Sequence, residues 1–201
     1  MPAGGGGPSI TLRALRPEDA PAVAELWRRG LQQGIDETHV LFRWAMSLLM
    51  LLVEWHALGS SGDIGPNGGN LYAAWGGAEY PARDGQASCR LMLVALDEGA
   101  GGDGAVVGCC GVKRGSDERE NVRDATATDV FSIWRMSVSE KARRGGVGRR
   151  LMTACEMWAA EHGGRKMVLS TGNPAASRFY LKLGYTNTRF ALFEKELVSK
   201  E

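Results

Sequence analysis

Residues 143–152 read RRGGVGRRLM, four arginines and three glycines that lead directly into an apolar run. From Val147 onward the apolar residues recur at spacings of three and four, which predicts an amphipathic helix beginning inside this stretch. Backbone N–H groups at a helix start attract anions, and glycines let a ligand approach them closely. Because Arg143, Arg144 and Arg149 suit phosphate, we interpret the loop as a pyrophosphate-binding loop. The alternative interpretation is a solvated basic surface.

Two common phosphate-binding motifs do not match this loop. A P-loop needs a lysine followed by serine or threonine, and a Rossmann turn needs a third small residue where this chain has Leu151. Only about 50 residues follow the loop, too few for a dinucleotide-binding domain. A different phosphate-binding fold is therefore expected.

The chain has 201 residues, of which 44% are hydrophobic and 23% charged. This size favours one domain, which we place at residues 9–198, after a flexible glycine-rich N-terminus at 1–8. A second glycine-rich stretch, 59–88, is interpreted as an irregular insertion in that domain.

The formal net charge is +1, which argues against nucleic acid as a partner. The four cysteines lack metal-ligand spacing, so no metal is expected. Reduced thiols and the absence of a signal-peptide pattern favour a cytoplasmic location.

The segments around the loop predict a mixed sheet with helices packed on it, an α/β (α+β) fold. The helix after 171 has clear boundaries, since Asn173 suits its N-cap, Pro174 its first turn and Gly184 its end. The other predicted elements, in chain order, are a strand at 9–15, a helix from 16 to about 30, an apolar segment at 40–58, two hairpin strands within 89–115, a strand at 129–139, the helix that begins at 147 and ends at 163–164, a strand at 166–171, and one or two strands after 184.

Two motifs occur in this order. Arg143-x-x-Gly146-x-Gly148 fits the pattern [R/Q]-x-x-G-x-[G/A], and Asn173-x-x-Ala176-x-x-x-Tyr180-x-x-x-Gly184-Tyr185 fits N-x-x-A-x-x-x-Y-x-x-x-G-[FY]. On these motifs the chain resembles the GCN5-related N-acetyltransferases, the GNAT superfamily, over roughly residues 9–197. The segments FSIWRMSVSEKARRGGVGRRLM and LSTGNPAASRFYLKLGY are most similar to its camello-like group.

The resemblance implies a mostly antiparallel mixed sheet with helices on both faces and a splayed strand pair that holds the arm of coenzyme A (CoA). It also implies an N-acetyltransferase that uses acetyl-CoA and acts on a primary amine of a small molecule, an amino-acid conjugate or a protein or peptide. The alternative is a non-catalytic acyl-CoA-binding module with the same fold.

The resemblance also assigns roles to residues. Backbone groups of Met136, Ser137 and Val138 bind the thioester and pantetheine arm, and Asn173 contacts the pantetheine. Tyr180 lies near the sulfur and donates a hydrogen bond or a proton to the departing thiolate, although core packing also explains a tyrosine there. The residues implied to bind the pyrophosphate are Arg143, Arg144, Gly145, Gly146, Val147, Gly148 and Arg149.

A general base is not evident from the sequence. Some family members carry a glutamate where this chain has Ser132. The remaining candidates are Asp129, Glu37, His39 and a water chain. A missing carboxylate favours an acceptor amine of low pKa, which is neutral without assistance.

The apolar segment 40–58 has an unbroken apolar core too short for the roughly 20 residues of a membrane span. Three interpretations stay open: a helix buried against the sheet, an interfacial helix giving peripheral membrane association, or a homodimer contact.

Overall fold

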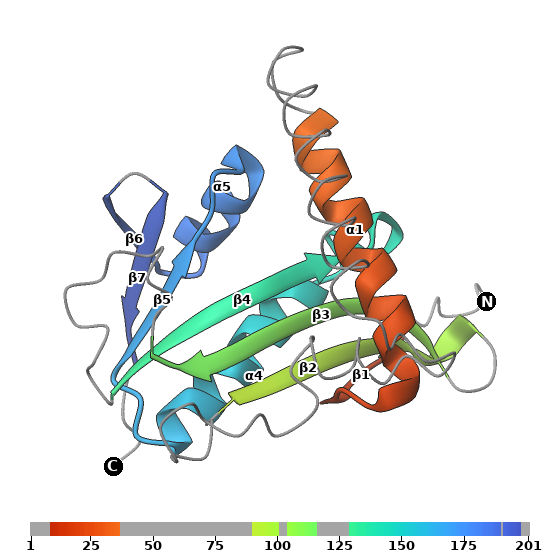
Figure 1. The fold of residues 1–201 in the computed structure, drawn as a ribbon, viewed down its shortest axis with the longest axis horizontal. Helices are drawn as coiled ribbons and strands as arrows, with labels where there is room; N and C mark the ends of the chain where they lie inside the picture. Colours follow the sequence, from red (N-terminus) through yellow and green to blue (C-terminus); the bar gives the residue numbers. More distant parts are fainter. Residues whose placement is uncertain (1–8, 37–89, 101–103, 116–128, 190, 198–201) are drawn as a thin grey trace, which may run out of the picture.

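The computed structural model describes residues 9–36, 90–100, 104–115, 129–189 and 191–197. Within them a seven-stranded sheet has the order β1-β2-β3-β4-β5-β7-β6 (Figure 1). Neighbouring strands are antiparallel except for β4 and β5, which are parallel. The strands are β1 (Ile10–Ala14), β2 (Arg90–Asp97), β3 (Ala105–Arg114), β4 (Val130–Val138), β5 (Lys166–Ser170), β6 (Thr186–Arg189) and β7 (Leu192–Glu196).

Helices lie on both faces of the sheet, with α1 (Ala20–Asp36) on one face and α4 (Val147–Glu161) on the other (Figure 1). Side chains alternate between the faces along each strand. On β2, Val94 packs in the cluster beneath α1, whereas Ala95 packs in the cluster beneath α4. The predicted mixed, mostly antiparallel sheet with helices on both faces is confirmed.

The predicted strands and helices agree with the structure in order and type where they fall on described residues. Both helices that follow the arginine loop end as expected, because Gly163 and Gly184 take the left-handed conformation, with φ of 83° and 87°. The shorter one is α5 (Pro174–Lys182). The segments 1–8, 40–58 and 59–88 lie outside the described residues, so those predictions stay untested.

The prediction that the first helix ends near Gly30 is wrong, because α1 continues to Asp36. It also starts later than expected, after a 3-10 turn, η1 (Pro17–Asp19). A Cβ atom at position 30 would lie 2.8 Å from Ser137 Oγ, whose hydroxyl donates to the Leu26 carbonyl at 3.2 Å. Gly30 therefore marks the close approach of α1 to β4, and not a helix end.

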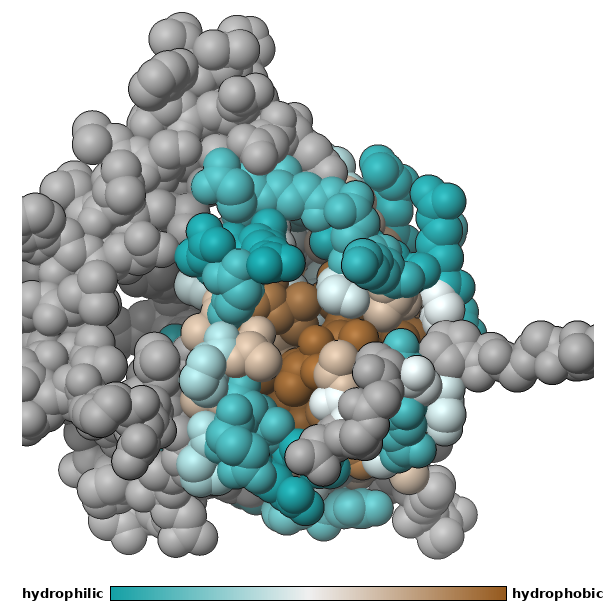
Figure 2. Space-filling view, turned by 90° about the vertical axis from the view of Figure 1, so that its right-hand side faces the viewer, coloured by the Kyte–Doolittle hydropathy of each residue, from teal (hydrophilic) through white to brown (hydrophobic). Residues whose placement is uncertain are grey.

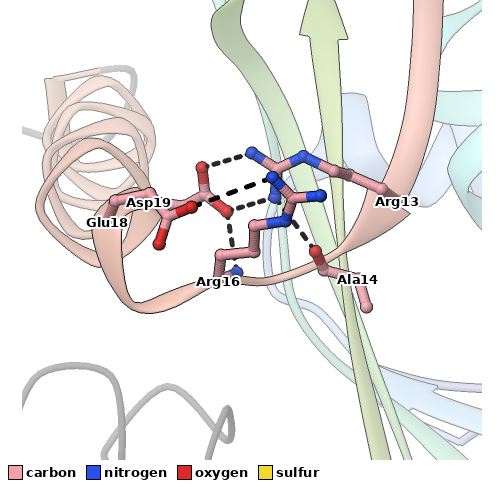
Figure 3. A network of polar contacts seen from close by, with 5 residues as sticks. All are labelled: Arg13, Ala14, Arg16, Glu18 and Asp19. Atoms are coloured by element: carbon pink, nitrogen blue, oxygen red, sulfur yellow. Dashed lines mark hydrogen bonds and ion pairs between the residues drawn. The ribbon is translucent and has the colours of Figure 1, made fainter. Parts of the chain in front are cut away.

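A buried carboxylate fixes the start of α1. Asp19 accepts hydrogen bonds from both terminal nitrogens of Arg13, at 2.5 and 2.8 Å, and from the Arg16 backbone N–H at 2.8 Å (Figure 3). The hydrogen bond to Asp19 raises the pKa of Arg13. Because Arg13 belongs to the edge strand β1, the Arg13–Asp19 ion pair holds the 3-10 turn η1 against the edge of the sheet.

Candidate active site

The sheet opens between its two parallel strands. β4 and β5 pair only from Val130 and Lys166 to Ser132 and Val168, although both strands continue beyond that point. The strands diverge toward their C-terminal ends (Figure 1). This is the splayed strand pair that the family resemblance implied.

A β-bulge lies on β4 at the open part. Ser137 pairs with Cys109 and Trp134 with Gly111, so Arg135 and Met136 together lie opposite Cys110. Arg135 has a left-handed φ of 52°, which few non-glycine residues adopt. An extra residue in one strand bends it and redirects its backbone groups. The bulge consists of Arg135 and Met136, so it overlaps the start of 136–138, the segment predicted to bind the thioester.

The bulge also places two consecutive side chains together. The Arg135 guanidinium lies 4.7 Å from the centre of the Trp134 ring and 5.8 Å from that of Trp27 on α1. Regular strand alternation assigns residues 134 and 135 to opposite faces, so no sequence pattern indicates this cluster. It lies on the α1 side of the sheet, next to the opening.

The arginine loop presents exposed backbone at the start of α4. Gly146 is the N-cap with a φ of 80°, and its cap makes no side-chain hydrogen bond. Arg144 also has a positive φ, 65°, while buried Val147 anchors the first turn of the helix. Successive N–H groups in such alternating conformations form an anion-binding concavity, strengthened by the helix dipole.

The side chains of the loop add positive charge to that concavity. Arg143, Arg144 and Arg149 are exposed, and none forms an ion pair with an acidic residue in the described part of the chain. The Nε atom of Arg143 donates to the Val138 carbonyl at 3.2 Å, which joins the loop to the end of β4. The predicted phosphate-binding residues and the predicted thioester-binding strand are therefore adjacent.

Gly148 explains how α5 approaches this loop. A Cβ atom there would lie 3.2 Å from both Met136 Cε and Phe179 Cζ. The bulge of β4, the first turn of α4 and the middle of α5 meet at this glycine. Figure 2, drawn from the side toward which β4 points in Figure 1, shows apolar side chains in the centre with hydrophilic ones around them.

Tyr180 combines a packed ring with a hydroxyl that has no hydrogen-bond partner among the described residues. Tyr180 is only 6% exposed, and the centre of its ring lies 5.8 Å from the ring centre of Tyr185 and 6.1 Å from that of Phe193. No other described residue hydrogen-bonds to the hydroxyl, and burial raises its pKa above the ordinary value. The group is thus held protonated, as a donor must be. Core packing and a functional hydroxyl are both compatible with this position.

Asn173 is the N-cap of α5. Its Oδ1 atom accepts from the backbone N–H groups of Ala175 and Ala176, at 2.8 and 3.2 Å. The cap uses the single oxygen of the Asn173 side chain. A contact of Asn173 with pantetheine stays a prediction.

A family model described as Acetyltransferase (GNAT) family matches residues 68–185, more than half of the chain. This chain belongs to the GNAT family. The family places it among the N-acetyltransferases, whose donor is an acyl-CoA. No curated protein sequence matches the chain.

Solved structures share this GNAT fold at low sequence identity. A GNAT-family acetyltransferase from Staphylococcus aureus Mu50 is 11% identical, with a TM-score of 0.60 over 94% of this chain and 100% of its own. The PaiA N-acetyltransferase from Thermoplasma acidophilum, solved with coenzyme A, is 15% identical, with a TM-score of 0.58 over 94% and 99%. A GCN5-related N-acetyltransferase from Kribbella flavida is 18% identical, with a TM-score of 0.57 over 94% and 98%.

The candidate bases of this GNAT chain differ in position. Ser132 is fully buried, and its hydroxyl donates to the Gly115 carbonyl at 2.7 Å, so it holds backbone and does not replace a catalytic carboxylate. Asp129 is half-buried directly before β4, at the closed end of the strand pair. Glu37 and His39 lie outside the described residues.

Two further findings concern the described residues only. They hold no group of three or more His, Cys, Asp or Glu side chains arranged to bind a metal ion. None of their helices is long and apolar enough to cross a membrane.

Proposed function

We propose that this GNAT chain transfers the acetyl group of acetyl-CoA to a primary amine. The observation that carries the proposal is the continuity of the site. The exposed loop at the start of α4 is bonded to the end of β4 through Arg143 and Val138. From there the bulge and Gly148 lead to α5, which carries Tyr180.

In the proposed arrangement the parts of acetyl-CoA follow this path. Backbone N–H groups of Gly146, Val147 and Gly148 and the side chains of Arg143, Arg144 and Arg149 hold the pyrophosphate, with Gly145 leaving room beside them. The pantetheine arm lies in the opening between β4 and β5, against the backbone of 136–138 and beside Asn173. The thioester then lies near the bulge.

The transfer needs one bond made and one broken. The amine nitrogen attacks the thioester carbonyl, the C–N bond forms, and the C–S bond breaks to leave the CoA thiolate. Tyr180 donates its hydroxyl proton to that thiolate, whose pKa lies near ~8.5. A tyrosine hydroxyl with its ordinary pKa near ~10 is already protonated at neutral pH, and burial raises the pKa of Tyr180 further, so the donor form is present. Solvent then restores the proton to the tyrosine, and the amine loses its own proton to water or to an unassigned base.

The acceptor must supply a neutral amine. For a lysine side chain of pKa ~10.4, the neutral form at pH 7 costs about 4.6 kcal/mol, whereas an α-amino group near ~8 costs about 1.4 kcal/mol. Ser132 provides no carboxylate to offset the larger cost. We therefore propose an acceptor of low pKa, such as the α-amino group of an amino-acid conjugate or peptide.

The same observation on Ser132 supports a second candidate, a non-catalytic acyl-CoA-binding module. It predicts acetyl-CoA binding without turnover.

The narrower similarity to the camello-like group rests on the two quoted sequence segments and remains a proposal. A cytoplasmic location and any membrane or dimer contact through 40–58 also remain proposals.

The test measures thiol release from acetyl-CoA with two acceptor peptides. The first has a free α-amino group. The second is the same peptide with its N-terminus acetylated, so that one lysine side chain is its remaining primary amine. Transfer to the first peptide, with kcat lowered at least about 10²-fold by Tyr180→Phe, supports the enzyme. Glu161→Gln, on the exposed side of α4, is the control and keeps full activity. Acetyl-CoA binding with no release for any amine supports the binding module instead.

A further inference from the structure

Glu156 of α4 is the centre of a polar cluster beside the site. Its Oε1 accepts from the Tyr185 hydroxyl at 3.0 Å, and its Oε2 accepts from Lys195 Nζ at 2.8 Å. The side chains of Glu156 and Lys195 are only 15% and 25% exposed, and Tyr185 is 3% exposed. Because low exposure strengthens charge-assisted hydrogen bonds, this Glu156 cluster is held in one geometry.

The cluster joins elements that lie on either side of the β4–β5 pair. Glu156 belongs to α4, which packs on β2, β3 and β4. Lys195 belongs to β7, which pairs with β5, the far strand of the opening. The parallel pairing of β4 and β5 ends at Ser132 and Val168. Lys195 pairs with Met167, which itself pairs with Phe131 of β4, so the Glu156 cluster joins α4 to β7 beside the closed part of the strand pair.

The cluster also reaches Tyr180 through Tyr185. The backbone N–H of Tyr185 donates to the Tyr180 carbonyl at 3.1 Å, and the two rings meet edge to face at 5.8 Å. Tyr185 is thus fixed at its backbone to the end of α5 and at its hydroxyl to α4. A ring held at both ends leaves its neighbour little freedom to rotate.

We propose that Glu156, Tyr185 and Lys195 are positioning residues for Tyr180: their hydrogen bonds fix α5 against α4 and so aim the Tyr180 hydroxyl at the sulfur of CoA. This inference rests on the proposed function. The three residues touch neither the acetyl group nor the sulfur. Their effect is exerted through the direction of the Tyr180 O–H bond.

The test uses CoA itself, so it needs no acceptor. The thiolate of bound CoA is followed by its ultraviolet absorbance as the pH rises, with the desulfo-CoA complex of each variant as the blank. A hydrogen bond from Tyr180 stabilises the thiolate, so the bound thiol of the wild type has a lower pKa than free CoA. Tyr180→Phe raises that pKa by roughly one unit, the effect of losing one hydrogen bond to a charged group.

Tyr185→Phe keeps the ring and removes only the donor to Glu156. It is expected to raise the pKa of the bound thiol by about half a unit, and to add nothing in the Tyr180→Phe background, since coupled residues are not additive. Lys195→Met and Lys195→Arg form a second pair that serves if Tyr185→Phe does not fold. Lys195→Met raises the thiol pKa, whereas Lys195→Arg keeps the ion pair and the wild-type value. Glu161→Gln is the neutral control on the same helix.

The outcomes separate this inference from the function on which it rests. A shift in Tyr180→Phe with none in Tyr185→Phe or Lys195→Met overturns the inference and keeps the role of Tyr180. Shifts that add in the double variant also overturn it, because they show independent action. No shift in Tyr180→Phe removes the proposed role of Tyr180 and the inference together. Absence of CoA binding in the wild type removes the proposed function itself.

Discussion

Replacing Gly146 with alanine separates the conformational role of this glycine from its role beside a ligand. Its φ of 80° is left-handed, and a Cβ atom there would find nothing within 4 Å. The left-handed conformation costs an alanine roughly 1–2 kcal/mol, and the loss of unfolded-state freedom returns about 0.4–1 kcal/mol. The expected net loss of stability is about 1 kcal/mol, a fall in melting temperature of roughly 2–4 °C for a chain of this length.

Gly163→Ala is a matched control at the other end of the same helix. Gly163 has a φ of 83° and equally open space around its missing Cβ, but it lies away from the proposed pyrophosphate loop. Both variants should lose the same stability in urea or thermal unfolding. Only Gly146→Ala should bind acetyl-CoA more weakly, by about tenfold or more, because its methyl group enters the space assigned to the pyrophosphate. Equal acetyl-CoA affinity in the two variants would refute this reasoning.

Three other predictions concern the fold. Asp19→Ala should lower the free energy of unfolding by about 3 kcal/mol, since it leaves the Arg13 charge partly buried and unpaired. Glu25→Ala removes only solvent-exposed ion pairs with Arg28 and Arg29, so it should lower the urea midpoint much less. A similar midpoint for both would contradict it. Burial raises the pKa of Cys109 from 9.0 to about 12. Because only the unfolded chain then loses this proton, stability should fall as the pH rises from about 9 toward 12, by up to about 1.4 kcal/mol per pH unit, and Cys109→Ala should flatten that slope in urea titrations. Gly111→Ala should destabilise strongly, because its Cβ would lie 2.4 Å from Trp134 Nε1, and Gly111→Ala combined with Trp134→Leu should recover part of the loss.

Local signals made the second half of the fold predictable. The spacing of apolar residues after Val147 follows one face of α4, and the Asn173 cap and Gly184 bound α5. In each case the residue acts through backbone chemistry within a few positions of itself. Such signals carry from sequence to structure without knowledge of distant neighbours.

Gly30 shows where local reasoning fails. A glycine after a helical pattern is typical of a helix end, but here it admits Ser137 from a strand more than 100 residues away. The packing gained at that contact outweighs the helix propensity lost, about 1 kcal/mol for a glycine. The contact depends on the tertiary fold, and no residue near Gly30 in the sequence indicates it.

The site was predictable only in part for the same reason. The loop at 143–149 and the helix of Tyr180 carry motifs, and the structure brings them together beside the predicted opening. The side-chain arrangement at the bulge and the Glu156 cluster carry none. The hydrogen bonds of Glu156 on α4 reach Tyr185, which lies between α5 and β6, and Lys195 on β7, residues 29 and 39 positions away.

The central claim is that the arginine–glycine loop binds the pyrophosphate of acetyl-CoA. Calorimetric titration of the purified protein with acetyl-CoA tests it directly, with dephospho-CoA and the double variant Arg143→Ala/Arg144→Ala as comparisons. Micromolar binding is expected for both ligands in the wild type, with a loss of at least about tenfold in the variant, since each arginine lost removes a charge-assisted hydrogen bond. Folded wild-type protein that does not bind acetyl-CoA, or a variant that binds it equally well, would contradict the claim.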